Sequence, residues 1–274
     1  MVAYLGEIGN LVEVQCAADL STEVARPVRY QSTLGGATFA QVGPRTRRSW
    51  DVRLPRTSTP ADVATWQAFV EGEFGLGPWW FISDTAAVSN VISPRGSVLE
   101  SDTSPAGTSP NGGRMRLPHG AVAGRSLLVD SFTTLPLPWV DGHERVPVVP
   151  GVPVTASAWV DGAGAARMRI ALYRADGSVS RQVSGSNAPA PEPTRISVTV
   201  TPTSDEVSCM IFMGGVTAAY RITRPAISYT SEAQPWSVGA GAPKVHVAAI
   251  NQDATLAIEG RAMVGASLQV QEVG

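Results

Sequence analysis

The sequence predicts a mainly β protein that has one notable helix and two β-rich units. Three observations support this fold class. Short runs of alternating apolar and polar residues, separated by turn residues, recur along most of the 274 residues. A single segment, residues 59–74, carries apolar side chains at helical spacing. The amino-acid composition changes after Asp84. Residues 93–125 are rich in Pro, Gly and Ser, and regular short strands resume after them.

The composition is that of a globular protein with an unusually uncharged surface. Charged residues make up 16% of the chain, against about 25% in typical soluble domains. Sparse charge suits a subunit whose surface is covered by neighbours, and it equally suits the compositional bias of a GC-rich genome. The net charge is −2, and the one basic run, Arg45, Arg47 and Arg48, predicts a solvated strand face or an inter-subunit contact. Recognition of nucleic acid is therefore not expected.

Cysteines and hydropathy indicate where the chain is made. Only Cys16 and Cys209 occur, each flanked by apolar residues, so both are expected to be buried free thiols, with a single disulfide left open. The first residues lack a basic stretch followed by an apolar one, and no run approaches the roughly 18 apolar residues of a membrane span. We expect a protein made in a cytoplasm and not inserted in a membrane.

The first unit begins with strands. Residues 10–16 and 24–33 show the alternation of half-buried strands, and residues 34–38 indicate a turn. Residues 38–54 continue the strand pattern around a Gly43-Pro44 break, which predicts a long hairpin or a bent strand pair.

The helix is predicted from its start signals. Thr59 is a suitable N-cap, Pro60 suits the first helical position, and Asp62 places a carboxylate in the first turn. The apolar stripe reaches Phe74, and the glycines that follow, at 75 and 77, are expected to end the helix. Residues 79–82 are apolar throughout, which predicts a strand covered on both faces.

The second unit is predicted to be a β-sandwich of the jelly-roll type. Short strands recur without helices, and turns such as Asp161-Gly162 and Asp176-Gly177 separate them. The expected strands are residues 126–130, 152–160, 166–174, 195–201, 207–213 and 219–229.

The C-terminal residues predict how the two units are connected. Residues 244–250, 254–258 and 267–273 are expected to be strands that need partners beyond one another. We expect them to return to the sheet of the first unit. Residues 1–88 and 237–274 then form one domain, and residues 89–236 are inserted into it. The alternative is two consecutive domains.

Several segments resemble a known family of phage proteins. Arg48-Ser49-Trp50-Asp51-Val52, the helix residues Trp66-Gln67-Ala68-Phe69, and Gly75-x-Gly77-Pro78-Trp79-Trp80-Phe81 resemble minor tail proteins of long-tailed actinobacterial phages. The stretches 151–160, 222–227 and 236–239 resemble the carbohydrate-binding-module-like jelly rolls that such proteins carry.

The resemblance implies a tail-tube-like or distal-tail-like belt domain with an inserted jelly roll. It implies a structural virion protein at the tail tip that forms a homo-oligomeric ring. Its partners would be copies of itself and other tail proteins, namely the tail tube, the hub and the tape measure, and the jelly roll would contact neighbours or a host-surface glycan.

Local motifs give no support for an enzyme. None of the three histidines has a Cys, His or carboxylate at metal-site spacing, and no nucleophile elbow or phosphate-binding loop occurs. We therefore expect no catalytic residue, no cofactor and no metal site. A hydrolase would need a carboxylate pair, for which Glu100 with Asp102 and Asp141 with Glu144 are the local candidates.

One polar cluster has the composition of a sugar site. An aromatic ring packs on sugar C–H groups while carboxylates accept hydroxyl protons, and the residues that combine these features are Trp139, Asp141, His143 and Glu144. The alternative interpretation is a charged turn beside a packing Trp. Calcium bound by Asp141 and Glu144 is a further hypothesis, although their spacing is not that of a dedicated calcium loop.

Two other tryptophans are expected to be structural. Trp159 lies in a strand among small residues and is expected in the core, and Trp236 is expected to seal the junction between the units. The competing function is a free carbohydrate-binding module or lectin, for which the sandwich would be primary.

Overall fold

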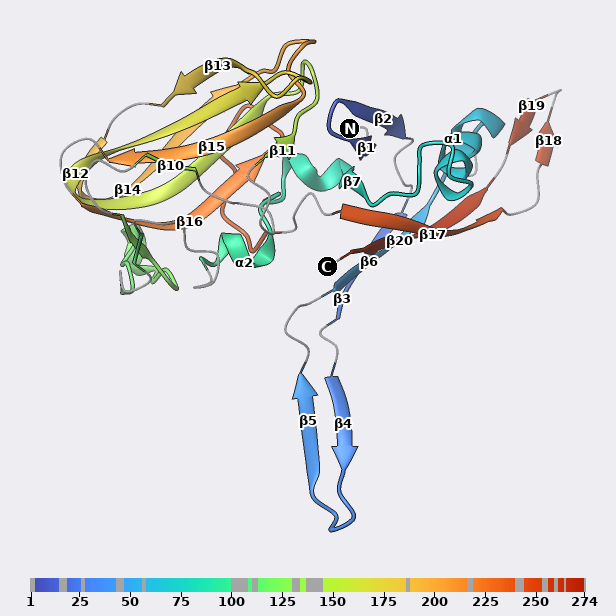
Figure 1. The fold of residues 1–274 in the computed structure, drawn as a ribbon, viewed down its shortest axis with the longest axis horizontal. Coiled ribbons are helices and arrows are strands. Elements are labelled where there is room, and N and C mark those ends of the chain that lie inside the picture. Colours follow the sequence, from blue (N-terminus) through green and yellow to red (C-terminus); the bar gives the residue numbers. More distant parts are fainter. Residues whose placement is uncertain are drawn as a thin grey trace. The chain divides into compact units, whose positions relative to one another are not determined.

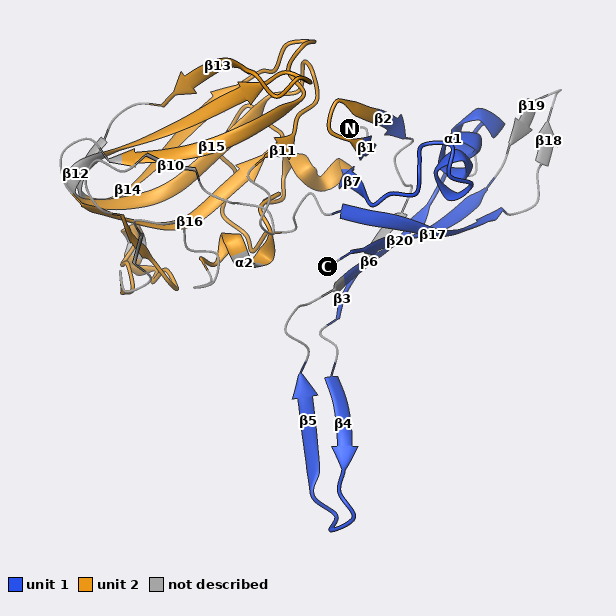
Figure 2. Ribbon diagram, viewed as in Figure 1, with its two compact units in different colours: residues 1–6, 12–83, 243–274 blue, residues 7–11, 84–242 orange. Residues whose placement is uncertain are grey.

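The chain folds as a mainly β protein with one substantial helix, which confirms the predicted fold class. The structure, a computed structural model, describes residues 3–14, 19–25, 28–42, 47–55, 58–99, 108–109, 113–129, 134–136, 145–185, 188–215, 219–239, 244–252, 256–258, 261–263 and 265–273. Two compact units are present, one of residues 1–6, 12–83 and 243–274 and a larger one of residues 7–11 and 84–242 (Figure 2). No helix in these ranges is long and apolar enough to cross a bilayer.

The smaller unit contains a seven-stranded sheet in the order β2-β1-β7-β17-β20-β6-β3 (Figure 1). Its neighbours pair antiparallel from β1 across to β3. Strands β17 and β20 lie in the middle of the order, so both ends of the chain contribute to one sheet. The prediction that residues 254–258 also return to this sheet is wrong for the described residues 256–258, because they pair with residues 261–263 in a separate two-stranded sheet. The bounds are β1 (Ala3–Glu7), β2 (Asn10–Val14), β3 (Asp19–Ala25), β6 (Arg47–Arg53), β7 (Trp79–Ile82), β17 (Lys244–Gln252) and β20 (Ala266–Glu272), with β18 (Leu256–Ile258) and β19 (Arg261–Met263) paired to each other.

Helix α1 (Pro60–Val70) supplies part of the core of this unit. Val63, Trp66 and Phe69 are at most 3% exposed and belong to the same apolar cluster as the buried side chains of the sheet. All four residues of β7 are buried, as predicted for a strand covered on both faces.

The start of α1 is confirmed, but its predicted end is wrong. The Thr59 hydroxyl accepts the backbone N–H of Asp62 at 3.3 Å, and the Asp62 carboxylate accepts the backbone N–H of Thr59 at 2.8 Å, which is a reciprocal cap. The helix ends at Val70 rather than at Phe74. Gly72 has φ +83°, a left-handed conformation that glycine adopts without steric cost, and this ends the helix before the two glycines that were expected to end it.

One residue of the basic run is not solvated. Arg48 is 7% exposed, and its backbone N–H donates to the Glu272 carboxylate at 3.1 Å. The predicted solvated face is therefore wrong for Arg48, because its side chain lies on the same face of β6 as the buried Trp50 and Val52. Arg45 lies outside the described residues.

The larger unit is a two-layered β-sandwich (Figure 1). Its strands are β8 (Thr108–Ser109), β9 (Leu127–Val129), β10 (Thr134–Pro136), β11 (Val146–Pro147), β12 (Val154–Tyr173), β13 (Val179–Ser184), β14 (Ala188–Val200), β15 (Ser208–Gly215) and β16 (Tyr220–Ser228). Short helical turns are η1 (Asp84–Ala87), α2 (Pro94–Ser97) and η3 (Pro118–Gly120).

The long strand β12 runs through both layers. Its first half pairs with β14 on one edge and β16 on the other, and its second half pairs with β13 and β15. Val200 pairs with Val154 at one end of β12, and Ser208 pairs with Tyr173 at the other end. A straight strand of this length spans about 65 Å, whereas the residues between Val200 and Ser208 reach about 25 Å. The strand must therefore fold back on itself.

The bend places one continuous apolar face inside the sandwich. Alternate residues of β12 in both halves are at most 1% exposed, namely Ala156, Ala158, Val160, Met168, Ile170 and Leu172. Gly162 lies at the bend with φ +136°, and a Cβ there would lie 2.9 Å from the Cα of Tyr220. Glycine therefore permits the close approach of β12 and β16 at this point.

The predicted turn at Asp161-Gly162, which separated two expected strands, is wrong. Gly162 pairs with Ala190 and Tyr220 in the ladder, and the Asp161 carboxylate accepts hydrogen bonds from the Arg221 guanidinium on β16. Asp161 is 5% exposed, so a residue typical of turns is held inside a strand by its ion pair.

Candidate functional site

The cluster predicted to bind a glycan lies outside the described residues; its members are Trp139, Asp141, His143 and Glu144. The strands on either side of it are described. β10 and β11 both pair antiparallel with β15, so the segment that carries the cluster connects two short strands on one neighbour. The guanidinium of Arg145, which follows the cluster, lies 4.0 Å from the centroid of the Tyr173 ring.

The candidate residues for other chemistry are mostly outside the described ranges as well. Glu100 and Asp102, the second carboxylate pair, are not described, and neither is Cys16. Among the residues that are described, no group of three or more His, Cys, Asp or Glu side chains could hold a metal ion. Cys209 is a free, fully buried thiol, as predicted, and burial raises its pKa to about 12.

Trp159 and Trp236 both lie in the larger unit. Trp159 is partly buried and packs against a small cluster of Met115, Leu117 and Ala123. Trp236 is also partly buried, and the Arg224 guanidinium lies 5.0 Å from the centroid of its ring.

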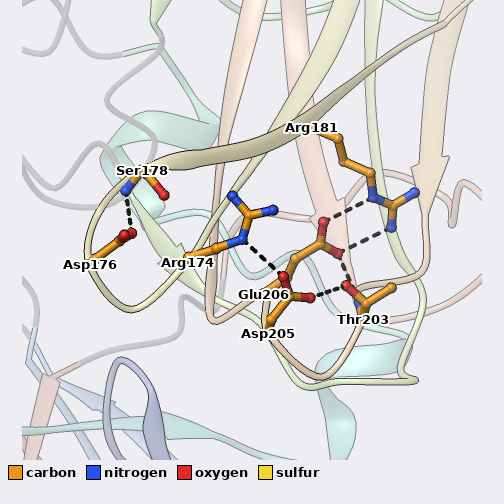
Figure 3. Close-up of polar contacts among 7 residues, drawn as sticks. All are labelled: Arg174, Asp176, Ser178, Arg181, Thr203, Asp205 and Glu206. Carbon is orange, nitrogen blue, oxygen red and sulfur yellow. Dashed lines mark hydrogen bonds and ion pairs between the residues drawn. The ribbon is translucent and has the colours of Figure 1, made fainter.

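The most developed polar network surrounds Glu206 (Figure 3). Arg181 of β13 donates to both Glu206 carboxylate oxygens, at 2.9 and 3.1 Å. The Glu206 side chain is 1% exposed, and it also accepts the backbone N–H of Thr203 at 2.8 Å. Arg181 further donates to the carbonyl of Thr201 at 2.7 Å.

A second ion pair lies beside it. Arg174 Nε donates to the Asp205 carboxylate at 2.9 Å, and that carboxylate accepts the Thr203 hydroxyl at 2.7 Å (Figure 3). Asp176 accepts the backbone N–H of Ser178 at 2.8 Å. Residues 174–178 connect β12 to β13, and residues 201–207 connect β14 to β15, so the network joins two turns at one end of the sandwich.

The charges of this network stabilise the structure rather than prepare a group for proton transfer. Burial alone raises the pKa of Glu206, but the hydrogen bonds from Arg181, Thr203 and Ser180 outweigh it and lower the pKa to about 2. The pKa of Asp205 is also lowered, by the hydrogen bonds from Thr203 and Arg174. Each carboxylate is held in its charged form by donors, so none of them is poised to exchange a proton near neutral pH.

The hairpin of β4 (Val28–Ser32) and β5 (Thr38–Val42) is the most exposed apolar feature. The two strands form a sheet of their own, and every residue from 28 to 42 is exposed. The exposed fractions of its large apolar residues are 43% for Val28, 71% for Tyr30, 111% for Leu34 at the turn, 62% for Phe39 and 50% for Val42.

The register of the hairpin divides its side chains between two unlike faces. Val28 pairs with Val42, and Tyr30 pairs with Ala40, so these four side chains share one face. The other face carries Arg29, Gln31, Gln41 and Phe39. The Ser32–Thr38 pair next to the turn lies on the same face as Val28 and Tyr30. That face is therefore apolar along the part of the hairpin away from the turn, and the other face is mostly polar.

The sequence predicted the strands of this hairpin and its turn, but the predicted half-burial of residues 24–33 is wrong. All the described residues in that range are exposed. Alternation indicates that a strand has one apolar face, and it carries no information on whether the same chain covers that face. Apolar residues at alternate positions of both strands, at 28, 30, 40 and 42, are the signal that could have indicated an apolar surface on this hairpin.

Comparisons with known proteins find partial structural likeness only. No protein-family model matches the sequence, and none of the curated proteins does. The CBM22-1 xylan-binding domain from Paenibacillus barcinonensis Xyn10C superposes with a TM-score of 0.32 at 14% identity, covering 46% of this chain and 88% of that chain. A carbohydrate-binding module from Cellvibrio mixtus lichenase 5A, in complex with cellotriose, gives 0.33 at 13% identity, covering 52% and 98%.

A phage protein is also among the similar structures. The enzymatically active domain of bacteriophage CBA120 tailspike protein 4 superposes with a TM-score of 0.34 at 12% identity, covering 51% of this chain and 21% of that chain. At TM-scores near 0.3 these superpositions do not by themselves establish a shared fold or a shared function.

Proposed function

We propose that this chain is a structural subunit of a phage tail tip that assembles with copies of itself into a ring. The observation that carries the proposal is the apolar face of the β4–β5 hairpin, formed by Val28, Tyr30, Ala40 and Val42. An isolated two-stranded hairpin is marginally stable in water, and exposed apolar patches mark interaction sites. Contact with another subunit would cover this face.

The sheet of the smaller unit supports head-to-tail assembly. Its order begins with β2 and ends with β3, so the described sheet has two different outer strands. Edge strands present unpaired backbone groups to a neighbour, and contacts between unlike surfaces form a ring when the rotation closes. The low charge content, 16%, also suits a subunit with extensive contacts.

The sandwich has a secondary role in this proposal. Residues 84–242 form a compact unit with its own core, available for contact with other tail proteins or with a host-surface glycan. The competing hypothesis is a free carbohydrate-binding module or lectin, which the completeness of this sandwich favours.

The test is the solution mass by light scattering across a range of concentrations, comparing the wild type with two hairpin variants. One variant carries Val28→Thr, Tyr30→Thr and Val42→Thr, which removes the apolar face while keeping residues of high strand propensity. The matched control carries Arg29→Thr, Gln31→Thr and Gln41→Thr on the opposite face. We expect a discrete multimer for the wild type and the control, and a shift of at least tenfold towards monomer for the first variant.

Two outcomes would contradict the proposal. Equal assembly of both variants would show that the apolar face is not the contact. A wild type that stays monomeric at every concentration, ignores tail proteins and is retained by an immobilised polysaccharide would support the carbohydrate-binding module instead.

A further inference from the structure

The last segment of the larger unit, residues 230–239, folds back over the outside of its own sandwich; this segment is here called the strap. β16 ends at Ser228, and the chain then passes beside Thr155 of β12 and contacts Arg195, which also binds Ser157 of β12. Thr155 and Ser157 alternate with the core residues Ala156 and Ala158, so they lie on the outer face of the layer. They are nevertheless only 1% and 2% exposed.

Side chains of the sheet donate hydrogen bonds to backbone carbonyls in the first half of the strap. Thr155 Oγ1 donates to the carbonyl of Thr230 at 2.7 Å, and Thr199 Oγ1 donates to that of Ser231 at 3.4 Å. The Arg195 guanidinium donates to the carbonyls of Ala233, at 3.4 Å, and Gln234, and also to the Ser157 hydroxyl at 2.9 Å. The donors come from β12 and β14, and the acceptors are backbone carbonyls of the strap, which forms no strand or helix of its own.

The second half of the strap is fastened near α2. Asn90 Nδ2 donates to the carbonyl of Ser237 at 3.1 Å, and the backbone N–H of Gly239 donates to Ser97 Oγ at 2.8 Å. Gly239 is buried, and a Cβ there would lie 2.7 Å from the carbonyl oxygen of Ser93 and closer still to that of Ile92. Only glycine fits this contact.

The strap buries little apolar surface of its own. No side chain from 230 to 238 is fully buried, and the largest, Trp236, is partly exposed beneath the Arg224 guanidinium. The apolar core residues of the sheet, among them Ala156 and Ala158, lie on the opposite face of β12 from Thr155, which contacts the strap. Segments held by polar contacts, with few buried apolar side chains, open before the core that they cover.

We propose that the strap is a releasable fastening that undocks as a unit while the sheet of β14, β12 and β16 stays folded. Release gives the chain about ten additional residues, or about 35 Å of reach, before it enters β17 in the other unit. It also uncovers the polar face of Thr155, Ser157 and Arg195. The proposal concerns the larger unit alone and is independent of the ring.

The experiment is cleavage by a glutamate-specific protease at Glu232, which is exposed on the strap, measured by mass spectrometry on the full chain. Gly239→Ala places a Cβ too close to the backbone carbonyls of Ile92 and Ser93, so the strap can no longer pack near α2. Arg195→Ala removes the donor to two strap carbonyls. Gly124→Ala is the matched control, because a Cβ there meets nothing within 4 Å. We expect both strap variants to be cut at least tenfold faster than the wild type and the control, with unchanged midpoints of thermal unfolding.

The proposal is wrong if Glu232 becomes cleavable only as the sandwich unfolds, or if both variants lower the unfolding midpoint in step with the faster cleavage. It is also wrong if the wild type is cut as fast as an unfolded peptide, since the strap would then not be docked. If Gly239→Ala fails to fold, Arg195→Ala decides the question, because Arg195 lies on the outer face of β14, away from the core.

Discussion

Glu206 is a buried carboxylate whose charge is retained because three hydrogen bonds, from Arg181 and Thr203, are donated to it. Arg181 supplies a bidentate pair from β13, and the backbone N–H of Thr203 supplies a third donor from the same turn as Glu206. Removing a charged partner from such a site leaves donors without acceptors, which costs more than the net value of the bonds. A substitution of Glu206 therefore tests whether this network stabilises the contact between the two turns.

We expect Glu206→Gln to lower the free energy of unfolding of the larger unit by about 1.5–3 kcal/mol at pH 7. The pKa of Glu206 in the folded protein, about 2, is below the ordinary value of 4.5. A lowered pKa stabilises the fold above the ordinary value, and this stabilisation is lost as the pH falls from about 5 towards 2. The difference between wild type and variant should therefore narrow over that range, as measured by denaturant unfolding at several pH values.

Glu192→Gln is the control for this prediction, because Glu192 is exposed on β14 and its side chain forms no ion pair with any other described residue. A loss of stability in Glu206→Gln that is the same at pH 7 and pH 3 would show that the effect comes from packing rather than from charge.

At the scale of elements, the sequence predicts starts better than ends and strands better than bends. The start of α1 follows from a local pattern at Thr59, Pro60 and Asp62, whereas its end depends on which of several glycines adopts the left-handed conformation. The continuity of β12 was not predictable from turn residues, because Asp161 is held in the strand by Arg221, which lies 60 residues away.

The reciprocal cap of α1 has a measurable contribution. Thr59→Ala should lower the free energy of unfolding of the smaller unit by about 1 kcal/mol. The backbone N–H of Asp62 loses its side-chain acceptor, and the Asp62 carboxylate loses the hydroxyl that donates to it. Thr65→Ala, in the same helix, should have a smaller effect or none, since alanine has the higher helix propensity. Denaturant unfolding followed by tryptophan fluorescence measures both, and equal losses would contradict the role of the cap.

At the scale of the whole molecule, the sequence indicated the two-unit organisation through a change of composition after Asp84 and through C-terminal strands expected to join the first sheet. The structure places β17 and β20 in that sheet, whereas β18 pairs with β19. The boundaries at residues 88 and 237 stay predictions. The structure divides the chain at 83 and 242, close to the ends of β7 and the start of β17. The predicted glycan cluster stays a prediction as well, because its four residues lie outside the described ranges. The strands of the hairpin were predicted but their exposure was not, because burial depends on which segments pack against a strand.

A fragment of residues 84–242 should fold alone. Strand β12 pairs with β14, β15 and β16, and Asn90, near one end of the fragment, donates to the carbonyls of Pro225 and Ser237, near the other end. We expect a single cooperative thermal transition for the isolated fragment, with a midpoint close to that of the same unit in the full chain. A fragment that shows no cooperative transition would contradict the insertion of an independent domain.

The bend of β12 has a mechanical consequence for the sandwich. In many sandwiches the two layers are joined by loops, so a tensile load can slide one layer off the other. In this protein the same strand passes through both layers, and its ladder continues on each edge from β16 to β15 and from β14 to β13. Parting the layers therefore requires straightening β12 and breaking hydrogen bonds on both of its edges together, so the unit should yield to force in one step rather than by gradual sliding.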